Sequence, residues 1–358
     1  MKAIPDYKFL LHPQAVRRME SYFATLCDGG QAGAYLRALL CHVDPGSLGF
    51  DRFLELLVQT KRPQIFAESA VRGDGSDWNM TELSLLGDFS VAIPVTVYDN
   101  GLHSSPVVHD DPFPATLLFT AGALLRNGRG CVPADWPEVV TGQGIDPEAY
   151  YRLYERRLLP CLVHASQKAL SAGTGALITI PGLGCGQFAG KFGGQLASHL
   201  EKVLLRMVFE HHSALQGIQA IYFDPYGECG NNRREIQGIT LMTRPLTMGN
   251  SDKPQLCSPR RYQDSGDDFS GCQLFSVVAW DHVSWPGNDF FVGSRCTDDG
   301  VKAAATDSMR AVTGVTGRYS AEHCEYVPPG EYHNWADVVV RNQLQLVAAG
   351  NIEVLPQR

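Results

Sequence analysis

Residues 176–190 read ALITIPGLGCGQFAG, and a helical pattern follows them as far as Arg206. The first five residues are apolar or β-branched, as in a buried strand. The segment Gly182–Gly190 then holds four glycines in nine residues. Glycine lets the backbone approach a ligand closely, and N–H groups at a helix start bind anions. We therefore predict that this strand, loop and helix bind the diphosphate of a nucleotide-type ligand.

Two other interpretations of the loop remain open. It can be a tight strand-to-helix turn without a ligand. Gly184, Gly186 and Ala189 also match the GxGxxG/A dinucleotide pattern, with Asp224 as the acid for a ribose. However, the loop follows at least two expected strands, and Asp224 lies 34 residues beyond Gly190, whereas the dinucleotide fold places this acid about 20 residues on. An NAD-dependent Rossmann oxidoreductase is therefore a secondary alternative.

Strands that alternate with long helices on both sides of the loop predict an α/β fold with a largely parallel or mixed sheet. Asp146-Pro147-Glu148 is a typical helix start, with an Asp cap and Pro at the first helical position. The expected helices cover 13 to about 70, 146–173, 196–207 and 300–309, and residues 71–79 (VRGDGSDWN) form a loop. The expected strands are 89–98, 115–120, 176–180, 218–223, 236–242 and 274–280.

The composition limits the classes of partner. The formal net charge is −8 without a long basic run, which is unlike a nucleic-acid-binding surface. No stretch approaches 18 continuous apolar residues, and the first residues, MKAIPDYKFLLHPQ, contain no long apolar run, so we expect neither a membrane span nor a signal peptide. Ten cysteines without a CxxC pair predict buried thiols in a reducing, cytoplasmic setting.

A second motif is the loop from Asp281 to Gly300, which reads DHVSWPGNDFFVGSRCTDDG. Asp281 closes an expected strand, Asp289 follows in a Gly-Asn-Asp turn, and Asp298 or Asp299 precedes a helix and is expected to cap it. Asp, Asn and Gly are ordinary turn residues, but the aromatic residues between them suggest a pocket wall. Carboxylates beside a ribose can orient water for attack at the anomeric carbon or bind Mg²⁺, and the sequence leaves both options open.

Cys185 lies inside the glycine loop. A thiol nucleophile assisted by a histidine is a further, weaker hypothesis, because no known cysteine-hydrolase signature surrounds this residue.

Together, the two motifs resemble macrodomains, which bind ADP-ribose. The resemblance covers roughly residues 85 to 345, and the aspartate set is most similar to the subgroup of the bacterial effector MavL and its relatives, which remove ADP-ribose from arginine. Two macrodomain features are absent: an Asn-containing loop with a Gly triplet before the phosphate loop, and the Gly-Gly-Gly…Gln-Glu-Glu signature of glycohydrolases that cleave poly(ADP-ribose).

The resemblance implies a specific site and no metal or other cofactor. The residues expected to bind ADP-ribose are Gly182, Gly184, Cys185, Gly186, Gln187, Phe188, Ala189, Asn288 and Asp298. The residues expected to be catalytic are Asp281, Asp289 and Asp299. Asp289 or Asp299 would orient water, and Asp281 would hold a ribose hydroxyl or the guanidinium leaving group.

We therefore predict a macrodomain-like catalytic domain at 81–358 and a helical accessory segment at 1–80. The predicted activity removes mono-ADP-ribose from a modified protein, with arginine as the acceptor; nucleic acid and membranes are not expected partners. The main alternative is a module of the same fold that binds ADP-ribose without cleaving it.

Overall fold

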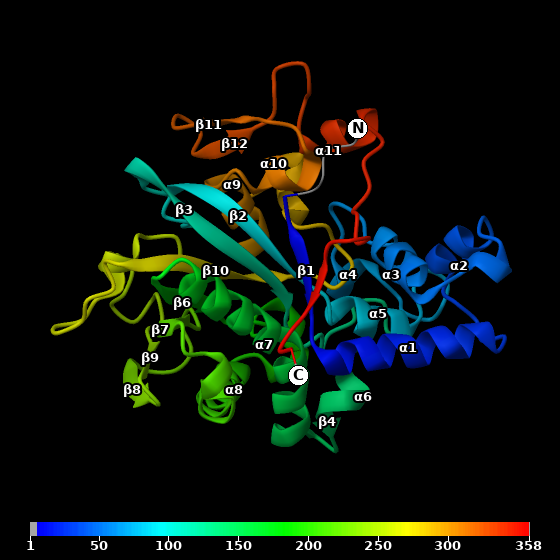
Figure 1. Cartoon of the computed structure of the whole chain (residues 1–358), viewed down its shortest axis with the longest axis horizontal. Helices are drawn as coiled ribbons and strands as arrows, with labels where there is room; N and C mark the ends of the chain where they lie inside the picture. The colour runs from blue at the N-terminus through cyan, green and yellow to red at the C-terminus, as the bar shows by residue number, and fades with distance from the viewer. Residues whose placement is uncertain (1–5, 358) are drawn as a thin grey trace.

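The strand before the glycine loop, β6 (Gly175–Pro181), lies inside a nine-stranded mixed sheet of order β13-β1-β2-β3-β10-β6-β7-β9-β8 (Figure 1). The structure is a computed structural model that describes residues 6–357, so residues 1–5 and 358 of the predicted domains lie outside it. The other strands of this sheet are β1 (Lys8–Leu11), β2 (Ser90–Asp99), β3 (Val108–Ala121), β7 (Ile218–Asp224), β8 (Asn232–Ile236), β9 (Ile239–Thr243), β10 (Cys272–Trp280) and β13 (Ile352–Val354).

Five neighbouring strands, β3, β10, β6, β7 and β9, run parallel to one another. β10 comes last of these in the chain but lies between β3 and β6, with Leu274 beside Ala115 and Leu177. Strands β1, β2 and β8 each have an antiparallel neighbour. The prediction of a mixed α/β sheet flanked by helices is confirmed. This order brings the carboxyl ends of β3, β10, β6 and β7 to one edge of the sheet, where open α/β sheets bind ligands.

Successive residues of the central strands enter two different hydrophobic cores, because side chains alternate between the faces of a sheet. In β10, Leu274 and Val278 belong to one core, whereas Phe275 and Val277 belong to the other. Helices α7 (Pro147–Ser171) and α8 (Leu196–His211) cover the second face. Helices α9 (Asp298–Ala305), α10 (Ser308–Thr313) and α11 (Trp335–Arg341) cover the first and lie on the opposite side of the sheet in Figure 1.

The predicted start of α7 is confirmed at Asp146. Its carboxylate accepts hydrogen bonds from the backbone N–H groups of Glu148 and Ala149, which satisfies donors that the first helical turn leaves unpaired. The helix continues through Pro160 and crosses β1, β2, β3, β6, β7 and β10. A short helix, α6 (Trp136–Val139), and the two-stranded sheet of β4 (Val140–Thr141) and β5 (Gly144–Ile145) precede it.

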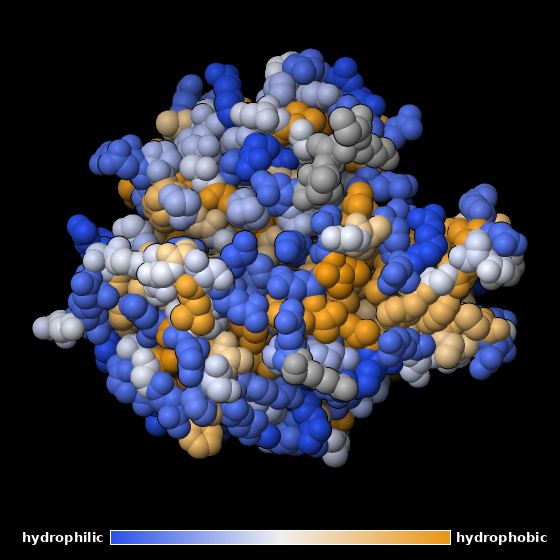
Figure 2. Space-filling view, in the orientation of Figure 1, coloured by the Kyte–Doolittle hydropathy of each residue, from blue (hydrophilic) through white to orange (hydrophobic). Residues whose placement is uncertain are grey.

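The N-terminal segment is mainly helical, as predicted, but it begins with the unpredicted strand β1. Its helices are α1 (Pro13–Cys27), α2 (Ala34–Leu40), α3 (Phe50–Gln59), α4 (Ala67–Ala70) and α5 (Met80–Gly87). The helix α5 was also not predicted, although Asn79 and Glu82 form a capping box at its start. The domain boundary at residue 80 stays a prediction. The two segments are in contact, because β1 pairs with β2 and β13 and the N-terminal helices share a core with α9–α11. Figure 2 shows apolar side chains gathered where β1 meets these helices, on a face that is otherwise mostly hydrophilic.

Two predicted elements are divided in the structure. The expected strand 236–242 is a hairpin, because Gln237 and Gly238 both take positive φ, as a two-residue turn requires. The expected helix 300–309 is interrupted between α9 and α10, where Thr306 bridges to Val97 of β2 and the Asp307 carboxylate accepts a hydrogen bond from the N–H of Thr96. The remaining elements are the hairpin β11 (Arg318–Ser320) and β12 (Glu325–Val327), and short 3-10 turns at Pro45–Ser47, Gln187–Phe192, His212–Ala214, Pro259–Tyr262 and Asn288–Val292.

A buried ion network joins the two segments beside the glycine loop. Arg157 of α7 is fully buried and pairs with Asp88, at the end of α5, and with Asp135. Asp135 also accepts a hydrogen bond from the ring of His282, which follows β10. Burial raises the pKa of Asp135, but the charge of Arg157 and the contact with His282 outweigh this effect and hold the pKa well below its usual range. The network joins the end of α5 and the end of β10 to the middle of α7.

Candidate active site

A cavity of about 730 Å³ lies at the carboxyl ends of the parallel strands. This volume is in the usual range for a site that holds one small molecule. Each strand contributes residues where it ends: Gly122 after β3, Pro181 and Gly182 from β6, Asp224 and Pro225 from β7, and Trp280 and Asp281 from β10. The cavity therefore lies where the topology predicts a ligand to bind.

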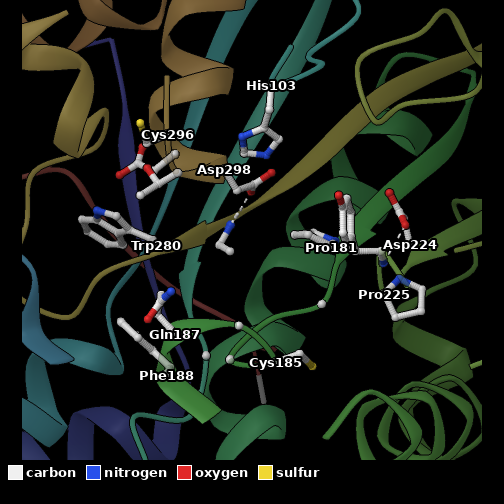
Figure 3. Close-up of a pocket in the computed structure, with 18 of the residues that line it drawn as sticks. His103, Pro181, Cys185, Gln187, Phe188, Asp224, Pro225, Trp280, Cys296 and Asp298 are labelled. Atoms are coloured by element: carbon white, nitrogen blue, oxygen red, sulfur yellow. Dashed lines mark hydrogen bonds between the residues drawn. The ribbon is translucent and has the colours of Figure 1, made fainter. Parts of the chain in front are cut away.

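The glycine loop forms the floor of the cavity. The cavity is lined there by six of the residues that the sequence predicted to bind the ligand: Gly182, Gly184, Cys185, Gly186, Gln187 and Phe188. Ala189 does not line the cavity; its side chain is buried in the core under α7 and α8. In Figure 3 the loop runs below the cavity, with Pro181 and Asp224 at one end and Trp280 and Cys296 at the other. The cavity is thus elongated, with the loop between its ends.

A close backbone approach from Gly122, after β3, and a positive φ explain the glycine at position 184 of this loop. A Cβ at Gly122 would lie 2.2 Å from the amide nitrogen of Gly184, and Gly184 itself has a φ of +71°. Tyr154 of α7 fixes the same contact, because its hydroxyl donates to the carbonyl of Leu183 and accepts from the N–H of Ala123. Within residues 6–357, the N–H of Gly186 donates no hydrogen bond to another protein group. The loop is held in one shape and has a free donor at its tip.

Cys185 is poorly suited to act as a nucleophile. Burial raises the pKa of its thiol well above the usual range, and the nearby Glu228 raises it further. Because the thiolate is the reactive form of cysteine, the geometry gives no support to the thiol hypothesis.

Asp281 lies at the end of the cavity that contains Trp280 and Cys296, here called the distal end. Its carboxylate is hydrogen-bonded to the N-terminal segment. One carboxylate oxygen accepts the N–H of Ala67, in α4, at 2.7 Å, and the other accepts the N–H of Val283. Burial raises its pKa to about 6, an effect that nearby Lys61 partly opposes. Burial in turn lowers the pKa of Lys61 to about 7, and this ammonium lies 3.9 Å from the ring centre of Trp280.

Asp299 also lines the cavity and shapes the loop beside it. Its two oxygens accept the N–H groups of Gly287 at 2.6 Å and Asn288 at 3.0 Å. Burial raises the pKa of Asp299 well above its usual range, and the charge of Asp289 adds to the rise. Asn288 lines the cavity as well, and its side-chain amide exchanges two hydrogen bonds with the backbone of Ile65.

Asp289 does not reach the cavity, in contrast to the other predicted aspartates. Its oxygens accept the N–H groups of Cys296 and Thr297 and the Thr297 hydroxyl. Gly300 packs against it so closely that a Cβ there would lie 2.1 Å from the Asp289 carboxylate. These contacts give Asp289 a role in holding the Cys296–Asp299 turn. Thr297, not an aspartate, caps α9, because its hydroxyl accepts the N–H of Gly300.

Asp298 is the most exposed of the three predicted aspartates that line the cavity, with 21% of its side chain exposed. Its Oδ2 accepts the N–H of Ala279 at 2.8 Å and faces the buried ammonium of Lys302 at 3.1 Å. Figure 3 shows this carboxylate above the glycine loop, between the two ends of the cavity. Within residues 6–357 its Oδ1 accepts no hydrogen bond, so this oxygen is free to bind a ligand hydroxyl or water.

Several residues that line the cavity were not predicted from the sequence. Phe66, Glu68 and Ser69 come from α4 and the residue before it, and Gly101, Leu102 and His103 follow β2. Asp224, considered earlier only as the ribose acid of a dinucleotide fold, also lines the cavity, where its Oδ1 accepts the N–H groups of Tyr226 and Leu246. The position of Asp224 at the end of an expected strand could have indicated a place in the site. The α4 residues carried no such signal, because they are distant in sequence from the other motifs.

The macrodomain effector MavL family matches residues 7–332 of this chain. The chain belongs to this family. The match begins beside β1 and includes the N-terminal helices, so the MavL-family unit spans both predicted segments together with the cavity. No curated protein sequence matches the chain closely enough to be significant. Among the described residues of this MavL-family chain, every helix is too short or too polar to cross a bilayer.

Proposed function

We propose that this protein hydrolyses the N-glycosidic bond between ADP-ribose and an arginine side chain of a modified protein. The observation that carries the proposal is the shape of one cavity, in which the glycine loop and Asp298 lie between an end beside Asp224 and Tyr226 and an end lined by Asp281 and Asp299. Membership of the macrodomain effector family supports ADP-ribose as the ligand. The bond, the acceptor and the catalysis are part of the proposal.

The two ends of the cavity suit the two ends of ADP-ribose. Pro225 and Tyr226, which is 65% exposed, offer an apolar and aromatic surface for a base beside the buried acceptor Asp224. The loop residues between Gly182 and Phe188 offer backbone N–H groups to a diphosphate. The distal ribose then lies next to the aspartates, and binding energy from the remote nucleotide positions its anomeric carbon.

In the proposed reaction, the open Oδ1 of Asp298 holds a water molecule or ribose hydroxyl, and Asp299 transfers the proton. The water oxygen bonds to the anomeric carbon while the C–N bond breaks. The electron pair of the C–N bond leaves with the guanidine nitrogen. One water proton passes through Asp299 to this nitrogen, so the arginine departs as its guanidinium cation and ADP-ribose carries the new hydroxyl. A raised carboxyl pKa suits such a group, since proton transfer is most efficient when the pKa is near the working pH.

The test uses a peptide mono-ADP-ribosylated on arginine and measures released ADP-ribose by mass spectrometry. We expect release by the wild type in excess EDTA, and a fall in kcat of about 10²-fold or more in Asp298→Asn or Asp299→Asn. The affinity of each variant for ADP-ribose, measured by calorimetry, shows whether binding survives. Intact substrate in the presence of tight ADP-ribose binding by the wild type would refute the proposal and identify a binding module. Activity that EDTA abolishes would indicate a Mg²⁺ mechanism instead.

A further inference from the structure

Glu68 reaches the distal end of the cavity from the N-terminal segment. It lies in α4, directly after Ala67, whose N–H is bonded to the Asp281 carboxylate at 2.7 Å. Three residues before Glu68, Ile65 is joined to Asn288 by two hydrogen bonds. The carbonyl of Glu68 itself accepts the N–H of Gly128. The backbone around Glu68 is therefore fixed on the aspartate loop, and its side chain lines the cavity beside Asp281.

The Glu68 side chain is mostly buried, and its carboxylate has no partner among the described residues. Only 8% of the residue is exposed. Among residues 6–357, no side chain or backbone N–H donates a hydrogen bond to this carboxylate, and no cation pairs with it. The predicted aspartates that line the cavity, Asp281, Asp298 and Asp299, all accept backbone N–H groups. The unpaired carboxylate of Glu68 therefore has both oxygens free to accept hydrogen bonds from a ligand in the cavity.

The charges at this end of the cavity determine which kind of ligand group Glu68 would bind. Glu68, Asp281 and Asp299 line it, and Asp298 lies next to it, above the glycine loop. The two buried lysines nearby are already engaged: Lys302 with Asp298, and Lys61 with the carbonyl of His282 and the ring of Trp280. A cation is therefore favoured at this end, whereas the phosphates of the ligand are placed at the glycine loop.

We propose that Glu68 binds the guanidinium group of the ADP-ribosylated arginine and thereby selects arginine over other acceptors. The inference rests on the proposed hydrolase function and names a specificity-determining residue for it. A planar guanidinium presents paired N–H donors that match the two oxygens of one carboxylate. Phe66, which lines the same end, offers an aromatic surface to a cation. An acceptor joined through serine or glutamate brings no positive charge and would leave Glu68 unpaired.

The experiment compares wild type, Glu68→Gln and Glu68→Asp on two peptides, one ADP-ribosylated on arginine and one on serine. The glutamine variant keeps the shape and removes the charge. We expect its kcat/KM for the arginine-linked peptide to fall about 10- to 100-fold, the range for a lost charge-assisted hydrogen bond, chiefly through KM. Its affinity for free ADP-ribose should stay within about twofold of the wild type. Glu322→Gln, an exposed site away from the cavity, controls for the loss of one negative charge.

The outcomes separate this inference from the proposed function. Wild-type activity that Glu68→Gln leaves unchanged on the arginine-linked peptide would overturn the role of Glu68 alone. An equal fall in kcat on both peptides would also overturn it, because that result describes a group in the chemical step. If the wild type binds ADP-ribose but cleaves neither peptide, the proposed hydrolysis fails. In that case, titration of ADP-ribose-loaded protein with L-arginine amide still tests Glu68: binding lost in Glu68→Gln supports the inference, and equal binding overturns it.

Discussion

Gly122→Ala should displace the glycine loop and weaken ADP-ribose binding. The new Cβ would lie 2.2 Å from the amide nitrogen of Gly184 and 2.5 Å from its Cα. Ordinary contacts between such atoms are about 3.5 Å or longer, so one backbone must move by roughly 1 Å. Tyr154 holds the loop from the other side, so the movement is not free. Overpacking of this kind costs about 1–3 kcal/mol of stability.

The effect on affinity follows from the same displacement. A shift of about 1 Å would break one or two backbone hydrogen bonds to the diphosphate, each worth about 1.5–3 kcal/mol when the acceptor is charged. The Kd for ADP-ribose should therefore rise at least about tenfold. Calorimetric titration measures it, and urea unfolding shows that the variant is folded at the temperature used.

Gly193→Ala is the matched control for this experiment. Its Cβ would meet nothing closer than 3.6 Å, its φ is −51°, and it lies outside the cavity lining. We expect wild-type affinity in this control. A folded Gly122→Ala protein that binds ADP-ribose as tightly as the wild type would refute the assignment of the loop as the diphosphate site.

Three further predictions concern pH and buried charge. Because burial raises the pKa of Asp281 to about 6, an activity that needs this carboxylate ionised should fall about tenfold per pH unit below pH 6; a kcat/KM profile that is flat between pH 5 and 7 would contradict this. Burial lowers the pKa of His12 to about 4, and its ring nitrogen caps α1 by accepting the N–H of Gln14. The neutral ring is therefore favoured in the folded state, so stability present above about pH 6.5 is lost as the pH falls towards 4. Urea titrations should show roughly 1 kcal/mol of such loss, after allowance for partial exposure, and Asn in place of His12 should cap the helix without this pH dependence. Finally, Arg157→Met should lower the free energy of unfolding by about 3–5 kcal/mol, because it leaves the buried Asp135 without its main partner; a loss below about 1 kcal/mol would contradict the importance of the network.

Local signals in the sequence predicted most of the helices and the central strands. The start of α7 was found because Asp146, Pro147 and Glu148 act within a single turn. The strands β6, β7 and β10 were found because a strand buried on both faces is apolar along its length. In contrast, β1 is four residues long and pairs with β13 at the other end of the chain. Nothing in its own residues identifies such a partner.

The site was predicted in part for a related reason. The glycine loop was recognisable because its glycines, its strand and its helix are adjacent in sequence. The aspartates were recognised as a group, but their directions were not, since residues in an irregular loop have no fixed periodicity. Asp298 and Asp299 are neighbours, yet each carboxylate has its own partners at the cavity, whereas Asp289 turns into the protein to hold Thr297.

The sequence by itself determined most of the helices, the central strands, the family resemblance and the loop that suits a diphosphate, because each depends on residues close together in the chain. Only the tertiary structure decided which carboxylates share the cavity and that Glu68 joins them. More than 200 residues separate Glu68 from Asp281, and they meet because the backbone of α4 is bonded to the loop after β10. Contacts of this kind depend on the packing of the whole fold, which no local pattern encodes.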